Sequence, residues 1–92
     1  MRLAGFNHAR DEVYNARYVI IPNPAQDKIT LHFTEPVDTY AVYVADAGGK
    51  ILMSEQSSSP RKTVDVEKLP KGIYFIVVEE RKVIYPAKFI KN

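Results

Sequence analysis

Short runs of alternating apolar and polar residues dominate the hydrophobic pattern of the chain. Within residues 27–33, Ile29, Leu31 and Phe33 fall on one face, and the residues between them are polar. An alternation with a period of two is typical of a half-buried β-strand, because successive side chains of a strand point to opposite faces. We therefore expect a strand over residues 27–33.

The same kind of pattern recurs along the chain and predicts strands in six further segments: 14–21, 39–46, 50–55, 63–66, 73–78 and 83–90. Residues 73–78 are apolar on both faces, which is typical of a central strand that is covered on both sides. No segment shows a convincing helical period. Short strands at regular spacing, with turn signals between them, predict an all-β, antiparallel sandwich.

Proline and glycine mark the connections between these strands. Pro22-Asn23-Pro24 ends the first strand, because each proline removes a hydrogen-bond donor and biases the preceding residue toward an extended conformation. Ala47-Gly48-Gly49 supplies the positive φ of a tight hairpin, and Leu69-Pro70-Lys71-Gly72 forms a further turn. Residues 79–82 are all charged and predict a polar hairpin turn, while Pro86 favours an edge position or a bulge in the last strand.

The first part of the chain differs from the rest. Residues 1–15 show no sustained apolar period, and we interpret them as a flexible lead-in or the end of a linker. Residues 16–92 then form the single domain that a chain of 92 residues can hold. Residues 1–15 also lack the apolar stretch of a secretory signal peptide. We therefore expect an exported form of this chain to be part of a longer precursor.

Composition and charge exclude several classes of partner. The formal net charge of +2 is too small to indicate binding to nucleic acid or to an anionic membrane. No apolar run reaches the roughly 18–20 residues that cross a bilayer, so we expect no direct membrane insertion. The chain contains no cysteine, which excludes disulfide bonds and thiolate metal sites.

The polar residues do not form a recognisable active site. His8, with Asp11 and Glu12 nearby, is the only cluster worth weighing as a metal site. A zinc site needs about four converging ligands, so a solvated polar tail is the better interpretation. Gly48-Gly49-Lys50 resembles half of a phosphate-binding loop, yet a strand follows it where a helix would be required. The sequence predicts a protein that is not an enzyme and that has no metal or cofactor.

Four motifs follow one another in a fixed order: Pro22-Asn23-Pro24-Ala25, then Val42-Tyr43-Val44 with Asp46, Gly49 and Lys50, then Val64-Asp65-Val66 with Leu69-Pro70-Lys71-Gly72-Ile73-Tyr74-Phe75, and finally Ala87-Lys88-Phe89-Ile90-Lys91-Asn92. A single motif of this kind is a weak signal, whereas the ordered series is a strong one. Over residues 18–92 the chain resembles the C-terminal sorting domain of the type IX secretion system (Por secretion system), type A.

This resemblance implies an immunoglobulin-like sandwich of seven strands, in agreement with the strand pattern. It also implies that the domain forms the C-terminal end of a larger cargo protein in a Gram-negative, Bacteroidetes-type bacterium. The secretion machinery would recognise it in the periplasm and export it to the cell surface or the medium, where a sortase-like cysteine peptidase would remove it.

Two other functions are alternatives to a role as a sorting signal. The main alternative is a retained periplasmic or surface module with the same fold, which would serve in binding or signalling. A carbohydrate-binding sandwich is disfavoured, because too few aspartates cluster for calcium. The sequence upstream of residue 1 would distinguish the sorting signal from the retained module, since a long cargo region there favours the sorting signal.

One group of motif residues is expected to be structural, by stiffening turns and fixing the fold: Pro22, Asn23, Pro24, Gly49, Lys50, Leu69, Pro70, Gly72 and Tyr74. Among them, Gly72 is expected to hold a backbone conformation that a Cβ would oppose. The hydroxyl of Tyr74 is expected to make a satisfied corner hydrogen bond.

A second group is expected to be read by the machinery, namely the terminal edge strand with Lys88, Phe89, Ile90, Lys91 and Asn92. An edge strand offers unpaired N–H and C=O groups for strand addition by a receptor. Its two lysines either repel unwanted pairing or meet an acidic partner. The family often ends in a basic residue, whereas this chain ends in Asn92.

Overall fold

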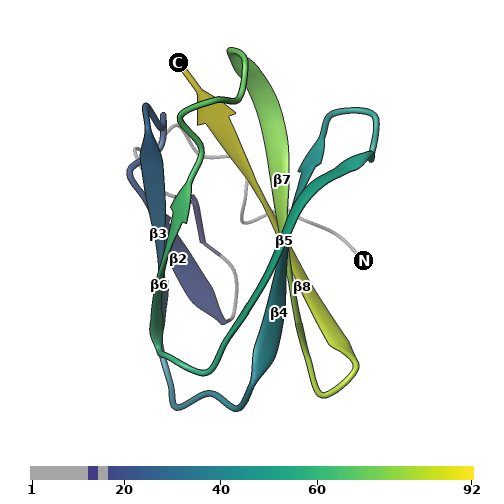
Figure 1. Ribbon diagram of the computed structural model, residues 1–92. Helices are drawn as coiled ribbons and strands as arrows, with labels where there is room; N and C mark the ends of the chain where they lie inside the picture. Colours follow the sequence, from purple (N-terminus) through teal and green to yellow (C-terminus); the bar gives the residue numbers. More distant parts are fainter. Residues whose placement is uncertain (1–12, 15–16) are drawn as a thin grey trace.

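The structure, a computed structural model, describes residues 13–14 and 17–92. The described part of the chain contains eight strands: β1 (Val13–Tyr14), β2 (Tyr18–Ile21), β3 (Lys28–Phe33), β4 (Tyr40–Asp46), β5 (Ile51–Ser57), β6 (Arg61–Asp65), β7 (Gly72–Glu80) and β8 (Val83–Lys91). They form a first sheet with the order β1-β2-β3-β6 and a second sheet with the order β5-β4-β7-β8. The two sheets face each other in Figure 1, and the predicted antiparallel sandwich is confirmed.

The core lies between the sheets and consists of the alternate apolar positions that the sequence pattern assigns to one face of each strand. Ile29 and Leu31 are fully buried in β3, as are Ile76 and Val78 in β7. Burial of a side chain of this size contributes roughly 1.5–3 kcal/mol relative to exposure. A thin core of this kind therefore depends on nearly every inward position.

Tyr18 and Tyr40 extend the core to the margins of the sandwich. Their hydroxyl groups donate to the backbone carbonyls of Tyr85 and Ser59 over 2.7 Å and 2.6 Å. A buried hydroxyl without a partner would be costly, so these bonds allow the rings to be buried. The bond from Tyr18 also joins β2 in the first sheet to β8 in the second.

The clearest departure from the sequence pattern concerns residues 79–82. β7 continues to Glu80, and the turn consists of Arg81 and Lys82, with φ angles of 53° and 66°. Positive φ at both central residues is the geometry of a tight hairpin turn. The prediction of a polar turn over all four residues is wrong, because Glu80 occupies an inward position of β7 and is buried.

The prediction of one strand over residues 14–21 is wrong at its start, because β2 begins at Tyr18 and Tyr14 belongs to a separate two-residue strand, β1. β1 pairs antiparallel with Val19 and Ile20 of β2. Most of the expected lead-in, including the cluster around His8, lies outside the described residues. The boundary between lead-in and domain at residues 15 and 16 stays a prediction.

Candidate functional site

The four sequence motifs come together at one end of the sandwich. The register places Asp46 beside Tyr74, and Gly72 beside Lys91. Ala25 forms a bridge to the same Lys91. In Figure 1 this is the end at which the chain's C-terminus lies, with the β4–β5 turn and the start of β7 around it. We call it the terminal end.

The segment from Pro22 to Ala25 is hydrogen-bonded to the end of β8. The N–H of Ala25 donates to the carbonyl of Ile90 over 2.7 Å, and the N–H of Asn92 donates to the carbonyl of Ala25 over 2.9 Å. The side-chain oxygen of Asn23 accepts the N–H of Ile90 over 2.9 Å. Both the Ile21–Pro22 and the Asn23–Pro24 peptide bonds are cis. The first motif and the last are therefore parts of one local structure.

These hydrogen bonds cover the free edge of β8 at its end. Because the N–H and C=O of Ile90 point away from β7, the backbone groups of Lys88 and Pro86, two and four positions earlier, share that direction. Pro86 has no N–H to offer an incoming strand. The expectation of an edge that is unpaired along residues 88–92 is therefore wrong, since Asn23 and Ala25 already occupy its last positions.

The side chains of the terminal strand divide between the two faces of the second sheet. Phe89 is fully buried in the core, and Lys91 also points inward and is only 9% exposed. The ammonium group of Lys91 donates to the carbonyl of Asn92 over 3.3 Å. Lys88 and Ile90 lie on the outer face. The expectation that both lysines are exposed on one edge is wrong for Lys91, while the recognition role of this strand stays a prediction.

The turn before β7 has the predicted local geometry. Gly72 has a φ of +153°, a conformation that side chains with a Cβ rarely adopt. The hydroxyl of Tyr74 donates to the carbonyl of Pro70 over 2.6 Å, which is the expected corner bond. The ring of Tyr74 stacks on Phe89 with centroids 5.6 Å apart. The third motif therefore supports the terminal strand from inside the sandwich.

The β4–β5 turn is closed by a carboxylate. One oxygen of Asp46 accepts the N–H groups of Gly48 and Lys50, each over 2.9 Å. Gly49 has a φ of +92°, so the predicted positive φ of this hairpin is found there. The side chain of Lys50 is exposed, while its backbone N–H takes part in this network. Within the motif, Lys50 is therefore the residue of the turn that follows Gly49.

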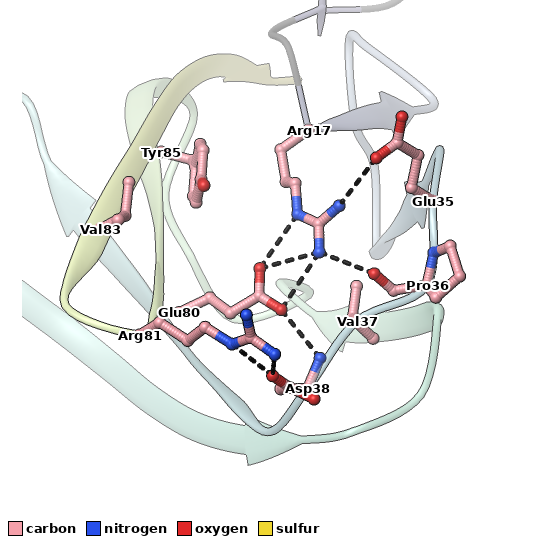
Figure 2. Close-up of a pocket in the computed structure, with 9 residues that line it drawn as sticks. All are labelled: Arg17, Glu35, Pro36, Val37, Asp38, Glu80, Arg81, Val83 and Tyr85. Carbon is pink, nitrogen blue, oxygen red and sulfur yellow. Dashed lines mark hydrogen bonds and ion pairs between the residues drawn. The ribbon is translucent and has the colours of Figure 1, made fainter.

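A second site, at the opposite end of the sandwich, was not anticipated from the sequence. Arg17 and Glu80 point toward each other, as Figure 2 shows. Both line a cavity of about 510 Å³. The guanidinium donates from Nε to Oε1 over 3.0 Å and from Nη2 to Oε2 over 3.1 Å. Nη2 also donates to the carbonyl of Pro36 over 2.8 Å, and Glu80 accepts the N–H of Asp38 over 2.8 Å.

This Arg17–Glu80 pair is a structural clamp. Its side chains are 15% and 7% exposed, and bidentate pairs of arginine and carboxylate are among the stronger hydrogen bonds in proteins. The pair ties the start of β2 to the β7–β8 hairpin and to the β3–β4 connection. No periodic signal identifies it, because Arg17 directly precedes an apolar run and Glu80 stands in a charged run.

Two kinds of feature are absent from the described residues, metal-ligand clusters and membrane-spanning helices. Within the part of the chain that the structure describes, no three histidine, cysteine, aspartate or glutamate side chains gather as a metal site. The same part contains no helix with the length and apolarity to traverse a membrane.

Comparison with solved structures identifies the fold more closely. A duf3244 family protein from Bacteroides vulgatus ATCC 8482, described as an immunoglobulin-like β-sandwich, is similar to this chain with a TM-score of 0.74. The similarity covers 89% of this chain and 98% of that one, at 15% sequence identity. An identity this low shows a shared fold alone. The predicted immunoglobulin-like architecture is thereby confirmed.

Among curated proteins, the small ribosomal subunit protein bS6 of Prochlorococcus marinus subsp. pastoris is 33% identical to this chain over 61 residues. The alignment covers 66% of this chain, and the chain spans 37% of the length of that relative. A partial match of this extent does not transfer the role of the whole protein.

A family match accounts for the ordered motifs. The family described as the secretion system C-terminal sorting domain matches residues 19–92, from β2 to the end of the chain. The matched range contains the terminal end with all four motifs. The chain belongs to the family of C-terminal sorting domains of the type IX secretion system.

Proposed function

We propose that the folded sandwich, rather than a linear stretch of its sequence, is the signal that the type IX machinery reads in the periplasm. The observation that carries this proposal is the pairing of Asn23 and Ala25 with Ile90 and Asn92. Because of this pairing, the last residues are presented in one conformation and are joined to a segment far away in sequence. A receptor for an extended tail would first have to break these bonds.

We further propose that the attached cargo leaves through the outer membrane to the cell surface or the medium, and that a sortase-like peptidase then releases the domain. A peptidase needs an extended substrate, and the backbone from Arg17 onward is held in the sandwich. The carbonyl of Arg17 accepts the N–H of Thr34 over 3.1 Å, and its side chain is clamped by Glu80. The cut is therefore expected upstream of Arg17.

The experiment is an export assay with a periplasmic reporter protein fused in front of residues 1–92. The fusion is expressed in a bacterium that carries the type IX system and in an isogenic strain that lacks it. We expect the reporter at the surface or in the medium of the first strain, without the domain, and in the periplasm of the second with the domain attached. Mass spectrometry of the released reporter locates the cut.

Two outcomes would contradict the proposal in different ways. Equal export in both strains would show that another route carries the fusion. Export that depends on the system, but with the domain still attached to the reporter, would refute the release step and favour the retained binding or signalling module.

A further inference from the structure

The outer faces of the two sheets differ in chemistry. Cross-strand rows on the outer face of the second sheet run Ile51–Ala45–Phe75–Lys88, Ser54–Tyr43–Val77–Pro86 and Gln56–Ala41–Glu79–Ile84, followed by the pair Ile73–Ile90. The corresponding rows of the first sheet run Ile21–Thr30–Thr63, Val19–His32–Arg61 and Lys28–Asp65. A sandwich in water places polar residues on its outer faces, as the first sheet largely does. The second sheet departs from that rule.

The apolar side chains of this face are accessible to solvent. Ile73, Ile84 and Ile90 are 47%, 60% and 42% exposed. They stand around Phe75 and Val77, which are half-buried. We call Tyr43, Ile73, Phe75, Val77, Ile84 and Ile90 the outer apolar face. The whole outer face of the second sheet, with four strands about 4.8 Å apart and roughly seven residues long, has an area on the order of 450 Å², and the outer apolar face is part of it.

Exposed lysines accompany the outer apolar face. Lys88 is the cross-strand neighbour of Phe75, and three further lysines stand next to strand ends of the second sheet: Lys50, Lys71 and Lys82. None of these four forms an ion pair with a described residue. The one carboxylate in the rows of this face is that of Glu79, as far as the described residues show. The face is therefore apolar with a positive rim.

We propose that the outer apolar face docks onto a protein of the secretion machinery that presents an apolar patch bordered by carboxylates. The inference rests on the proposed function and adds the surface and the chemistry of its partner. A standard interface covers about 800 Å² on each side, so the partner extends beyond the apolar face to the lysines around it. Carboxylates on the partner at that rim orient it and speed its association.

A second copy of the chain fits this surface poorly. Two copies that met through the same face would bring eight lysines together against two glutamates, and like charges across an interface are unfavourable. A lipid surface also fits poorly, because Ser54, Gln56 and Glu79 lie on the same face. Acyl chains offer these groups no hydrogen-bond partners, whereas a protein does.

The test uses the reporter fused to the full chain in the secreting bacterium. Ile84→Glu and Lys88→Glu are expected to reduce export at least about tenfold, because each places a negative charge where the partner presents apolar groups or carboxylates. Lys88→Arg keeps the charge and is expected to retain export. Thr63→Glu, on the outer face of the first sheet, is the matched control and is expected to be exported normally. Ile84→Thr keeps a β-branched residue at this strand position. It is the second variant to use if Ile84→Glu does not fold.

Photo-crosslinking then identifies the occupant. A benzoylphenylalanine in place of Ile84 is expected to crosslink to a protein of the secretion system in cells, and one in place of Thr63 is not. The product should disappear when Lys88→Glu is added. A crosslinked dimer of the fusion would overturn the proposal in favour of self-association, and crosslinking to lipid alone would overturn it in favour of a membrane.

The failures of the two proposals are distinguishable. If the unaltered fusion is not exported by the system, the sorting function itself fails. If the unaltered fusion is exported and both the Ile84→Glu and the Lys88→Glu variants are exported equally well, the sorting function stands and the docking face is wrong. Melting curves of the purified variants that match the parent exclude unfolding as the cause of any loss.

Discussion

The side-chain oxygen of Asn23 accepts the N–H of Ile90 over 2.9 Å, across 67 positions of the sequence. Asn23 is almost fully buried, although it stands between two prolines in a segment that reads as a turn. The asparagine of this motif is thus a structural partner of the last strand. The bond joins the segment that follows β2 to β8, so the position of each depends on the other.

Asn23→Ala is expected to destabilise the domain by about 0.5–1.5 kcal/mol, because the N–H of Ile90 would lose its partly buried partner. Chemical denaturation measures the change, and amide hydrogen exchange at Ile90 should accelerate. Gln26→Ala, at an exposed position in the same connection, is the control and should change stability by less than about 0.5 kcal/mol. Equal stabilities of the two variants would contradict the role assigned to Asn23.

Removal of the carboxylate in Glu80→Ala is expected to cost about 2–4 kcal/mol. Breaking a buried ion pair leaves an uncompensated charge, here partly relieved because Arg17 keeps the carbonyl of Pro36. Arg81 lies in the same hairpin as Glu80 and forms an exposed ion pair with Asp38. Arg81→Ala breaks this pair and should lower stability by less than about 1 kcal/mol. Denaturation midpoints compare the two, and a larger effect of Arg81→Ala would refute the clamp.

Gly72→Val is expected to lower stability by about 1–3 kcal/mol, because a β-branched residue is strained at the positive φ found there. Gly48→Ala is the matched control, since a Cβ at Gly48 would have only an ordinary contact, 3.5 Å from Asp46. Thermal melting measures both variants. An unchanged melting temperature of Gly72→Val would show that the backbone relaxes without cost.

The two terminal lysines should respond differently to charge reversal. Lys88→Glu is expected to leave the stability within about 0.5 kcal/mol of the parent, because Lys88 is exposed on the outer face. Lys91→Glu places a carboxylate at an inward position beside the carbonyl of Asn92 and should cost about 1–3 kcal/mol. Similar melting curves for the two variants would contradict the inward orientation of Lys91.

Local signals predicted much of this fold. The alternation in residues 27–33 and 39–46 fixed which side chains are buried, and the corner bond of Tyr74 followed from its place after a glycine turn. Such features depend on neighbours in sequence, for which periodicity and turn chemistry are informative.

Contacts between distant segments could not be predicted in the same way. The pairing of Ala25 with Lys91 and the clamp between Arg17 and Glu80 join residues more than 60 positions apart. A polar residue carries no local mark that distinguishes a buried partner from a solvated surface. The predictions of an unpaired edge strand and of an exposed Lys91 were wrong for this reason.

The order in which a ribosome makes the chain gives the last strand a further importance. β8 supplies Ala87 and Phe89 to the core, and its end holds the segment from Pro22 to Ala25 in place. A nascent chain therefore cannot complete the sandwich until its final strand has emerged, and premature termination before that point leaves β7 without its outer neighbour. Recognition of the folded sandwich would in this way also verify that translation had reached the end of β8.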